Sequence, residues 1–157
     1  MGGVSVLIPA FNAARSVGEA ISSALEQDRV EQILVVDDGS TDATPQVLDS
    51  FGSRIRWVRQ SRQGPNPTRN RLLHWSSAAW LQFLDADDAL MPGKIRRQLE
   101  RAEGCDVVAS PSLQGGLTRH WGPGEDPWIR FFHAHLGITS TNLWRREAVM
   151  AIGGWNP

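Results

Sequence analysis

The chain has 157 residues, of which 41% are apolar and 21% charged, and its formal net charge is −1. This composition is typical of one globular domain with a hydrophobic core, and the small net charge argues against nucleic acid as a partner. No apolar run approaches the roughly 20 residues that span a bilayer, and no secretory signal pattern opens the chain. We therefore expect a single domain, residues 1–157, with no membrane span.

The first half of the chain alternates strand and helix patterns. Apolar runs predict strands at residues 4–8, 33–36, 55–58 and 80–84. Apolar residues at helical spacing predict three intervening helices, and their inner faces contain Val17, Ala20, Ile21, Ala24 and Leu25, then Val47, Leu48 and Phe51, then Leu72, Leu73 and Trp75. We expect Asp42 or Thr44 to cap the second helix, with Pro45 in its first turn. This alternation predicts an α/β fold, a mostly parallel sheet with helices on both faces.

The second half is less regular. Pro92 opens a predicted helix with Ile95, Leu99 and Ala102 on its inner face, and residues 106–109 predict a strand. Glycines at 115–116 and 122–124 indicate loops, and further helices are predicted at 128–132 and 145–151.

The only cysteine, Cys105, cannot form a disulfide within the chain. It precedes the apolar run at 107–109, so we expect it beside a buried strand in a reducing compartment. This pattern favours a cytoplasmic protein, for which a peripheral position at the inner membrane face is also compatible.

Acidic residues follow two of the predicted strands. Asp37 and Asp38 end the second strand, and Asp85, Asp87 and Asp88 follow the fourth. In an open α/β sheet the strand ends at one edge form the ligand crevice, and carboxylates gathered there repel one another unless a cation or hydrogen-bond donors hold them. The sequence therefore predicts a site for a divalent metal and a phosphorylated ligand at this edge.

Each acidic segment also has a simpler interpretation. If residues 85–87 are extended, both carboxylates point the same way and can share one cation, but an Asp-x-Asp tripeptide also occurs in solvated turns. In the first segment Gly39 permits a tight turn, and Ser40 and Asp42 suit turn ordering and helix capping. For Asp38 we favour a ligand contact.

Five short motifs occur in order along the chain. Together they strongly resemble the family 2 glycosyltransferases of GT-A fold, over residues 4–155: Ile8-Pro9-Ala10-Phe11-Asn12, Val36-Asp37-Asp38-Gly39-Ser40-Thr41-Asp42, Thr68-Arg69-Asn70, Phe83-Leu84-Asp85-Ala86-Asp87-Asp88 and Gly153-Gly154-Trp155. The resemblance implies a GT-A-like (Rossmann-like) domain that transfers a sugar, usually with inversion, from a nucleoside diphosphate sugar to an acceptor hydroxyl.

The resemblance also implies roles for particular residues. Mn²⁺ or Mg²⁺ is the implied cofactor, with Asp87 as the first choice of metal ligand and Asp85 as the second. Such an ion neutralises charge on the leaving diphosphate. The implied donor-binding set is Pro9, Phe11 and Asp38 at the nucleoside, Arg69 near the base or phosphates, and Asp85 and Asp87 at the ribose, metal and diphosphate.

The chain departs from the family pattern in three places. Phe11 stands where the family often has Tyr, and Thr68 where it often has Ala. The general base that an inverting displacement requires is expected beyond Pro157, so we expect a donor-binding domain that lacks the C-terminal base and acceptor segment. The residues identify neither the base and sugar of the donor nor the acceptor.

Several alternatives follow from these departures. A non-catalytic module that binds a nucleotide sugar, or a subunit completed by a partner chain, fits the same residues. Glu125 or Asp126 as a substitute base is disfavoured against a solvated loop, and His120, His133 and His135 are interpreted as structural. The chain also lacks the glycine-rich phosphate loop of a sugar nucleotidyltransferase and the lysine of a receiver protein. A homo-oligomer would cover apolar residues near the C-terminus, namely Trp144, Val149, Ile152 and Trp155.

Overall fold

The computed structural model describes residues 2–114, 117–119 and 139–156. Its main sheet has six strands in the order β3-β2-β1-β4-β8-β5. Strands β1 to β4 are parallel to one another, whereas β8 is antiparallel to both β4 and β5. Their bounds are Val4–Ala10 for β1, Val30–Asp37 for β2, Arg56–Arg59 for β3, Trp80–Phe83 for β4, Val107–Val108 for β5 and Leu143–Arg145 for β8.

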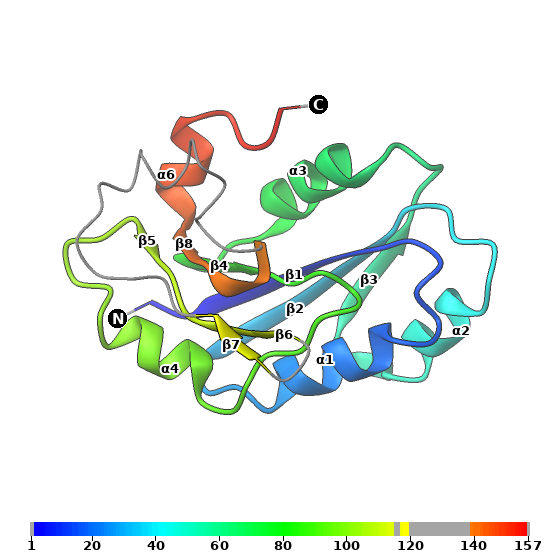
Figure 1. Ribbon diagram of the computed structural model, residues 1–157. Helices are drawn as coiled ribbons and strands as arrows, with labels where there is room; N and C mark the ends of the chain where they lie inside the picture. The colour runs from blue at the N-terminus through cyan, green and yellow to red at the C-terminus, as the bar shows by residue number, and fades with distance from the viewer. Residues whose placement is uncertain (1, 115–116, 120–138, 157) are drawn as a thin grey trace.

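Helices cover both faces of the sheet (Figure 1). One face carries α1 (Val17–Leu25), α2 (Thr44–Asp49) and α4 (Lys94–Leu99), and the other carries α3 (Pro65–Trp75) and α6 (Arg146–Ala151). Two 3-10 turns, η1 (Gly52–Arg54) and η2 (Thr139–Thr141), complete the regular structure of the main layers. The predicted mostly parallel sheet with helices on both faces is confirmed.

Alternation along the central strands divides the core into two layers. In β1, Val6 and Ile8 pack with the α1 side, whereas Leu7 packs with the α3 side. All three are fully buried, as expected for a parallel strand covered on both faces. The same alternation continues in β2, where Val35 and Val36 face opposite layers. Alternate residues of each apolar strand therefore supply the two core layers, one on each face of the sheet.

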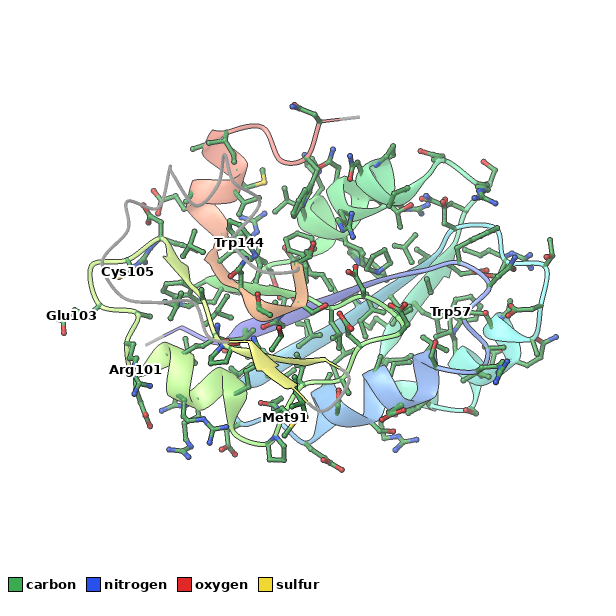
Figure 2. All side chains as sticks on the ribbon, viewed as in Figure 1. Trp57, Met91, Arg101, Glu103, Cys105 and Trp144 are labelled. Atoms are coloured by element: carbon green, nitrogen blue, oxygen red, sulfur yellow. The ribbon has the colours of Figure 1, made fainter. Side chains whose placement is uncertain are left out.

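The structure differs from the sequence expectation around β5. This short strand lies at the sheet edge, Val107 is exposed, and Cys105 is exposed in the outer loop that follows α4 (Figure 2). The prediction that Cys105 lies beside a buried strand is therefore wrong. The strand β8 was not predicted, because three residues show too little period to identify a strand.

Two further strands, β6 (Ser112–Gln114) and β7 (Leu117–Arg119), form a separate antiparallel pair. The sequence indicated only loops here. The predicted loops at 115–116 and 122–124, the helix at 128–132, and Glu125, Asp126, His120, His133 and His135 lie outside the described residues. No helix in the described ranges combines the length and apolar character needed to cross a bilayer.

Most of the apolar residues near the C-terminus are covered by the chain itself. The Trp155 ring packs edge-to-face against Phe83, with 5.4 Å between centroids, and against Trp144 at 6.3 Å. Val149 is buried in the same cluster, and only Ile152 is strongly exposed, at 77%. The expectation that another surface covers these residues is therefore wrong for Trp144, Val149 and Trp155, and for Ile152 it stays a prediction.

Buried residues of the central strand β4 should contribute more to stability than exposed residues of the small sheet. Leu81 is fully buried, so Leu81→Ala should lower the free energy of unfolding by about 2–5 kcal/mol. Leu113 is 57% exposed, and Leu113→Ala should change it by no more than about 0.5 kcal/mol. Urea unfolding of both variants measures the difference, and equal losses would contradict the assigned core.

Candidate functional site

A cleft of about 400 Å³ opens at the carboxyl ends of β1, β2 and β4. It contains every residue that the sequence placed at the donor: Pro9, Phe11, Asp38, Arg69, Asp85 and Asp87. Parallel pairing explains the convergence, because β1 lies between β2 and β4 and all three end at the same edge. The six predicted side chains therefore line one cavity.

Asp38 is buried and organises the segment that leads into α3. Its Oδ1 accepts hydrogen bonds from Gln60 Nε2 at 2.7 Å and Gln63 N at 2.9 Å, and its Oδ2 accepts one from Gly64 N at 2.8 Å. Burial raises the pKa of Asp38, but these hydrogen bonds together outweigh burial and hold the pKa below its ordinary value. The carboxylate is therefore ionised and already engaged, with room on Oδ2 for one further donor.

The rest of the first acidic motif ties two loops together. Ser40 Oγ accepts a hydrogen bond from Asn12 N at 2.9 Å, and Asp42 Oδ2 accepts one from Ala14 N at 3.1 Å. Asp42 Oδ1 also accepts one from Thr44 N, at the start of α2. This confirms the turn-ordering interpretation of Ser40. The N-cap of α2 is Ala43, without a side-chain capping hydrogen bond, so the interpretation of Asp42 as the helix cap is wrong. Both residues hold the loop after β1 against the loop after β2.

The second acidic motif forms a turn rather than an extended strand. Strand β4 ends at Phe83, and Asp88 N donates to Asp85 O at 3.0 Å, the hydrogen bond of a β-turn. The extended geometry assumed for residues 85–87 is therefore wrong, although Asp85 and Asp87 still line the same cleft. Burial raises the pKa of Asp88; a hydrogen bond from Ser140 opposes this, and the charges of Asp85 and Asp87 add to the rise.

Arg69 holds one of these carboxylates. Its Nη2 lies 2.8 Å from Asp85 Oδ1, with side-chain exposures of 15% and 31%. The guanidinium carbon lies 5.3 Å from the centroid of the Trp155 ring, a cation–π distance. Within the described residues, Arg69 Nε is buried without a hydrogen-bond partner. The ion pair and the ring fix the cation at the wall of the cleft.

Trp155 is positioned by Asn70, one residue beyond Arg69. Asn70 Oδ1 accepts from Trp155 N at 2.8 Å, and Asn70 Nδ2 donates to Trp155 O at 2.7 Å. Gly154 has φ +79°, and a Cβ there would lie 2.5 Å from Asn70 Oδ1. The motif Gly153-Gly154-Trp155 therefore packs against Asn70 of the motif Thr68-Arg69-Asn70. A side chain at position 154 would collide with Asn70, so this close approach of the backbone requires glycine.

Arg62 is a cleft residue that the sequence did not identify. Its guanidinium carbon lies 3.7 Å from the centroid of the Phe11 ring, and both residues line the cleft. Arg62 belongs to no motif. Its position three residues beyond the end of β3 was the available signal, since the segment after a parallel strand opens at the same edge.

The carboxylate oxygens of the cleft suit a hard divalent cation as metal ligands. Arg69 engages one oxygen of Asp85, which leaves the second oxygen and the exposed Asp87 carboxylate as oxygen donors. No group of three His, Cys, Asp or Glu side chains able to hold a metal occurs among the residues that the structure describes. Mg²⁺ typically binds one or two carboxylates and completes its shell with water and substrate phosphates, so this pair fits.

The fold and the cleft define an α/β protein whose cleft opens at the carboxyl ends of a parallel sheet. Residues 5–154 match the family described as Glycosyl transferase family 2. The chain belongs to this family.

Relatives and solved structures agree with this assignment. The chain is 37% identical over 153 residues to the succinoglycan biosynthesis protein ExoO of Rhizobium meliloti, covering 92% of this chain and 44% of that protein. It is 34% identical over 99 residues to WfgD of Escherichia coli, named UDP-Glc:alpha-D-GlcNAc-diphosphoundecaprenol beta-1,3-glucosyltransferase, covering 61% of this chain and 39% of that protein. The chain thus spans less than half the length of these relatives.

Two solved structures share the fold. S. aureus TarS (1–349) in complex with UDP-GlcNAc superimposes with a TM-score of 0.79 at 18% identity, covering 99% of this chain and 48% of that one. A mannosyltransferase from Pyrobaculum calidifontis, in complex with GDP-Man and Mn²⁺, superimposes with a TM-score of 0.72 at 19% identity, over 99% and 48% of the two chains. These likenesses confirm the GT-A-like fold.

The contact at Gly154 can be separated from backbone strain. Gly153 and Gly154 have nearly equal positive φ, but only Gly154 faces Asn70. Gly153→Ala should cost about 1–2 kcal/mol of unfolding free energy from φ alone. Gly154→Ala should cost more, since it also breaks the Asn70 contact with Trp155. Urea unfolding, followed by tryptophan fluorescence, compares the two, and equal costs would contradict the clamp.

The Asp38 contacts predict acid sensitivity. The pKa of Asp38 is lower in the folded state than in the unfolded state, where it is about 3.9. The ionised carboxylate therefore contributes its full stabilisation above a pH of about 3.9, and this contribution is lost as pH falls through the lower pKa of the folded state. Asp38→Asn should therefore be less stable than the wild type at pH 6, and the gap should narrow from pH 4 to pH 2. The difference in unfolding free energy between Asp38→Asn and wild type is measured at each pH, and Asp49→Asn, at an exposed position, is the control. A difference that stays constant from pH 6 to pH 2 would contradict the stabilising role of the Asp38 hydrogen bonds.

Proposed function

We propose that this domain binds the nucleoside diphosphate sugar donor of a glycosyltransferase, and that the protein transfers the sugar to an acceptor hydroxyl. The observation that supports this most strongly is the cleft in which the carboxylates of Asp38 and Asp85, held by the fold, meet two arginines and an aromatic ring. Membership of glycosyl transferase family 2 supports the same reaction class.

Each side of the cleft suits one part of the donor. Phe11 and Pro9 offer apolar surface to the nucleoside, with Arg62 stacked on the Phe11 ring. The remaining lone pair of Asp38 Oδ2 can accept a hydrogen bond from the base or ribose. Arg69 carries the positive charge that a diphosphate requires, and its pairing with Asp85 keeps that charge in place before the ligand arrives.

Asp87, with Asp85, would hold Mn²⁺ or Mg²⁺ in this proposal. When bound, such an ion supplies Lewis-acid stabilisation of the negative charge on the leaving diphosphate. The likeness to a mannosyltransferase solved with GDP-Man and Mn²⁺ supports this choice of cofactor. The carboxylates themselves orient the ribose side of the ligand and repel any anion that arrives without a cation.

The transfer step itself is a displacement at the anomeric carbon. The acceptor oxygen forms the new bond to that carbon as the bond to the diphosphate oxygen breaks, and the acceptor proton passes to a general base. Inversion is part of the proposal by family resemblance. We assign no base among the described residues, and the base expected beyond Pro157 stays a prediction.

The proposed compartment is the cytoplasm. Cys105 is exposed as a free thiol, and a reducing compartment preserves exposed thiols.

Thermal denaturation tests ligand and metal together. Nucleoside diphosphates of the different bases, all at the same concentration, should stabilise the fold only where the base fits. The nucleotide that fits should add about 4 kcal/mol when its concentration is about 1,000 times its dissociation constant. The shift should require Mn²⁺ in the wild type. Asp87→Asn should lose the Mn²⁺-dependent part of the shift, and Asp49→Asn, exposed and outside the cleft, should retain it.

Two outcomes would contradict the proposal. No shift with any nucleoside diphosphate, with or without Mn²⁺, would exclude donor binding by this domain. An equal Mn²⁺-dependent shift in Asp87→Asn and wild type would remove Asp87 as a metal ligand.

A further inference from the structure

Lys94, the only lysine in the chain, is buried beside the acidic turn. It is the first residue of α4 and only 8% exposed. Its Nζ donates to Gln82 Oε1 at 2.6 Å and to Gln98 Oε1 at 2.7 Å. No carboxylate lies within ion-pair distance of this amine in the described part of the chain. A buried amine held by two neutral amides is costly, so the site calls for an explanation.

The two glutamines cannot turn their amides around. Gln82 Nε2 donates to Phe83 O at 2.7 Å and to Ser140 O at 2.9 Å. Gln98 Nε2 donates to Val108 O at 2.5 Å and Thr141 O at 3.0 Å. Because backbone carbonyls only accept, each amide nitrogen must face them, and each amide oxygen must therefore face Lys94. Without the lysine, two buried acceptors would lose their donor.

This network ends at the acidic turn. Ser140 Oγ donates to Asp88 Oδ2 at 2.6 Å and accepts from Asp85 N at 3.1 Å. The backbone carbonyl of the same serine is held by Gln82, and Gln82 is held by Lys94. A continuous chain of hydrogen bonds thus joins α4 to η2 and to the turn that carries Asp85 and Asp87.

We propose that Lys94 is a positioning residue, which fixes the acidic turn of the cleft through Gln82, Gln98 and Ser140. The link between Lys94 and the turn stands on these contacts alone, whereas its consequence for donor binding rests on the proposed function. Burial lowers the pKa of Lys94 to about 7, so its charge changes near neutral pH and provides a probe of the link.

Other charged groups lie in the same region and must be separated from Lys94. A second cleft of about 760 Å³ shares Asp87 with the first. Its charged lining residues are Lys94 and Arg97 of α4, Arg101 just after α4, and Asp87 and Asp88 of the acidic turn. The described residues that β5 and η2 contribute to this cleft are uncharged: Val108, Ser140 and Thr141. Arg97 is exposed on the same helix and donates to Pro92 O, so it serves as the matched control.

The test uses the 157-residue chain without ligand and nuclear magnetic resonance between pH 6 and pH 10.5. Lysine labelled with ¹³C at Cε gives one resonance, that of Lys94, and ¹⁵N labelling follows the Asp85 amide. In the wild type both signals should titrate with the same midpoint. Lys94→Met should remove that step from the Asp85 amide. Ser140→Ala should leave the lysine step and uncouple Asp85 from it, and Arg97→Met should change neither.

The proposal is overturned if the Asp85 amide does not follow the lysine in the wild type. It is equally overturned if the amide keeps the lysine midpoint in Ser140→Ala or in Lys94→Met. If Lys94→Met does not fold, the titrations of the wild type and of Ser140→Ala alone test the proposal. No ligand is involved, so a failure of nucleotide binding would leave this result standing, and the reverse is also true.

Discussion

Carboxylates gathered in one cleft must each be held, and this electrostatic constraint explains most of the site. Asp38 takes three donors from the segment before α3, and Asp85 takes the Arg69 guanidinium. Asp88 is partly buried, and burial keeps its pKa raised beside its two acidic neighbours. Asp87 is left exposed at the cleft. The fold thus satisfies the inner acids with its own groups and presents one carboxylate outward.

The holding groups come from distant parts of the chain. Arg69 is backed by Trp155, Trp155 is clamped by Asn70, and Gly154 permits that clamp. On the opposite side of β4, Ser140 joins the acidic turn to the interior network around Lys94. Two independent supports therefore meet at one turn of four residues, which explains why motifs near residues 70 and 154 accompany the acidic ones.

Sequence predicted the parts of the molecule that periodicity and strand-end logic control. The four parallel strands and the residues of the cleft follow from apolar runs that end in acids, since parallel strands share an edge. It failed where contacts are long-range or the segment is short. The three residues of β8 carry no period, and the turn at 85–88 depends on a hydrogen bond with Ser140. The stacking of Arg62 on Phe11 leaves no trace in the sequence, because Arg62 lies outside every motif.

The central claim is that this edge of the sheet holds a divalent cation together with a diphosphate. A crystal structure of the domain with MnCl₂ and a bound nucleoside diphosphate, with anomalous scattering recorded at the manganese edge, tests that claim most directly. The predicted result is one anomalous peak that is coordinated by the Asp87 carboxylate and by diphosphate oxygens, with Arg69 beside them. A nucleotide bound elsewhere, or a manganese peak distant from Asp87, would contradict it.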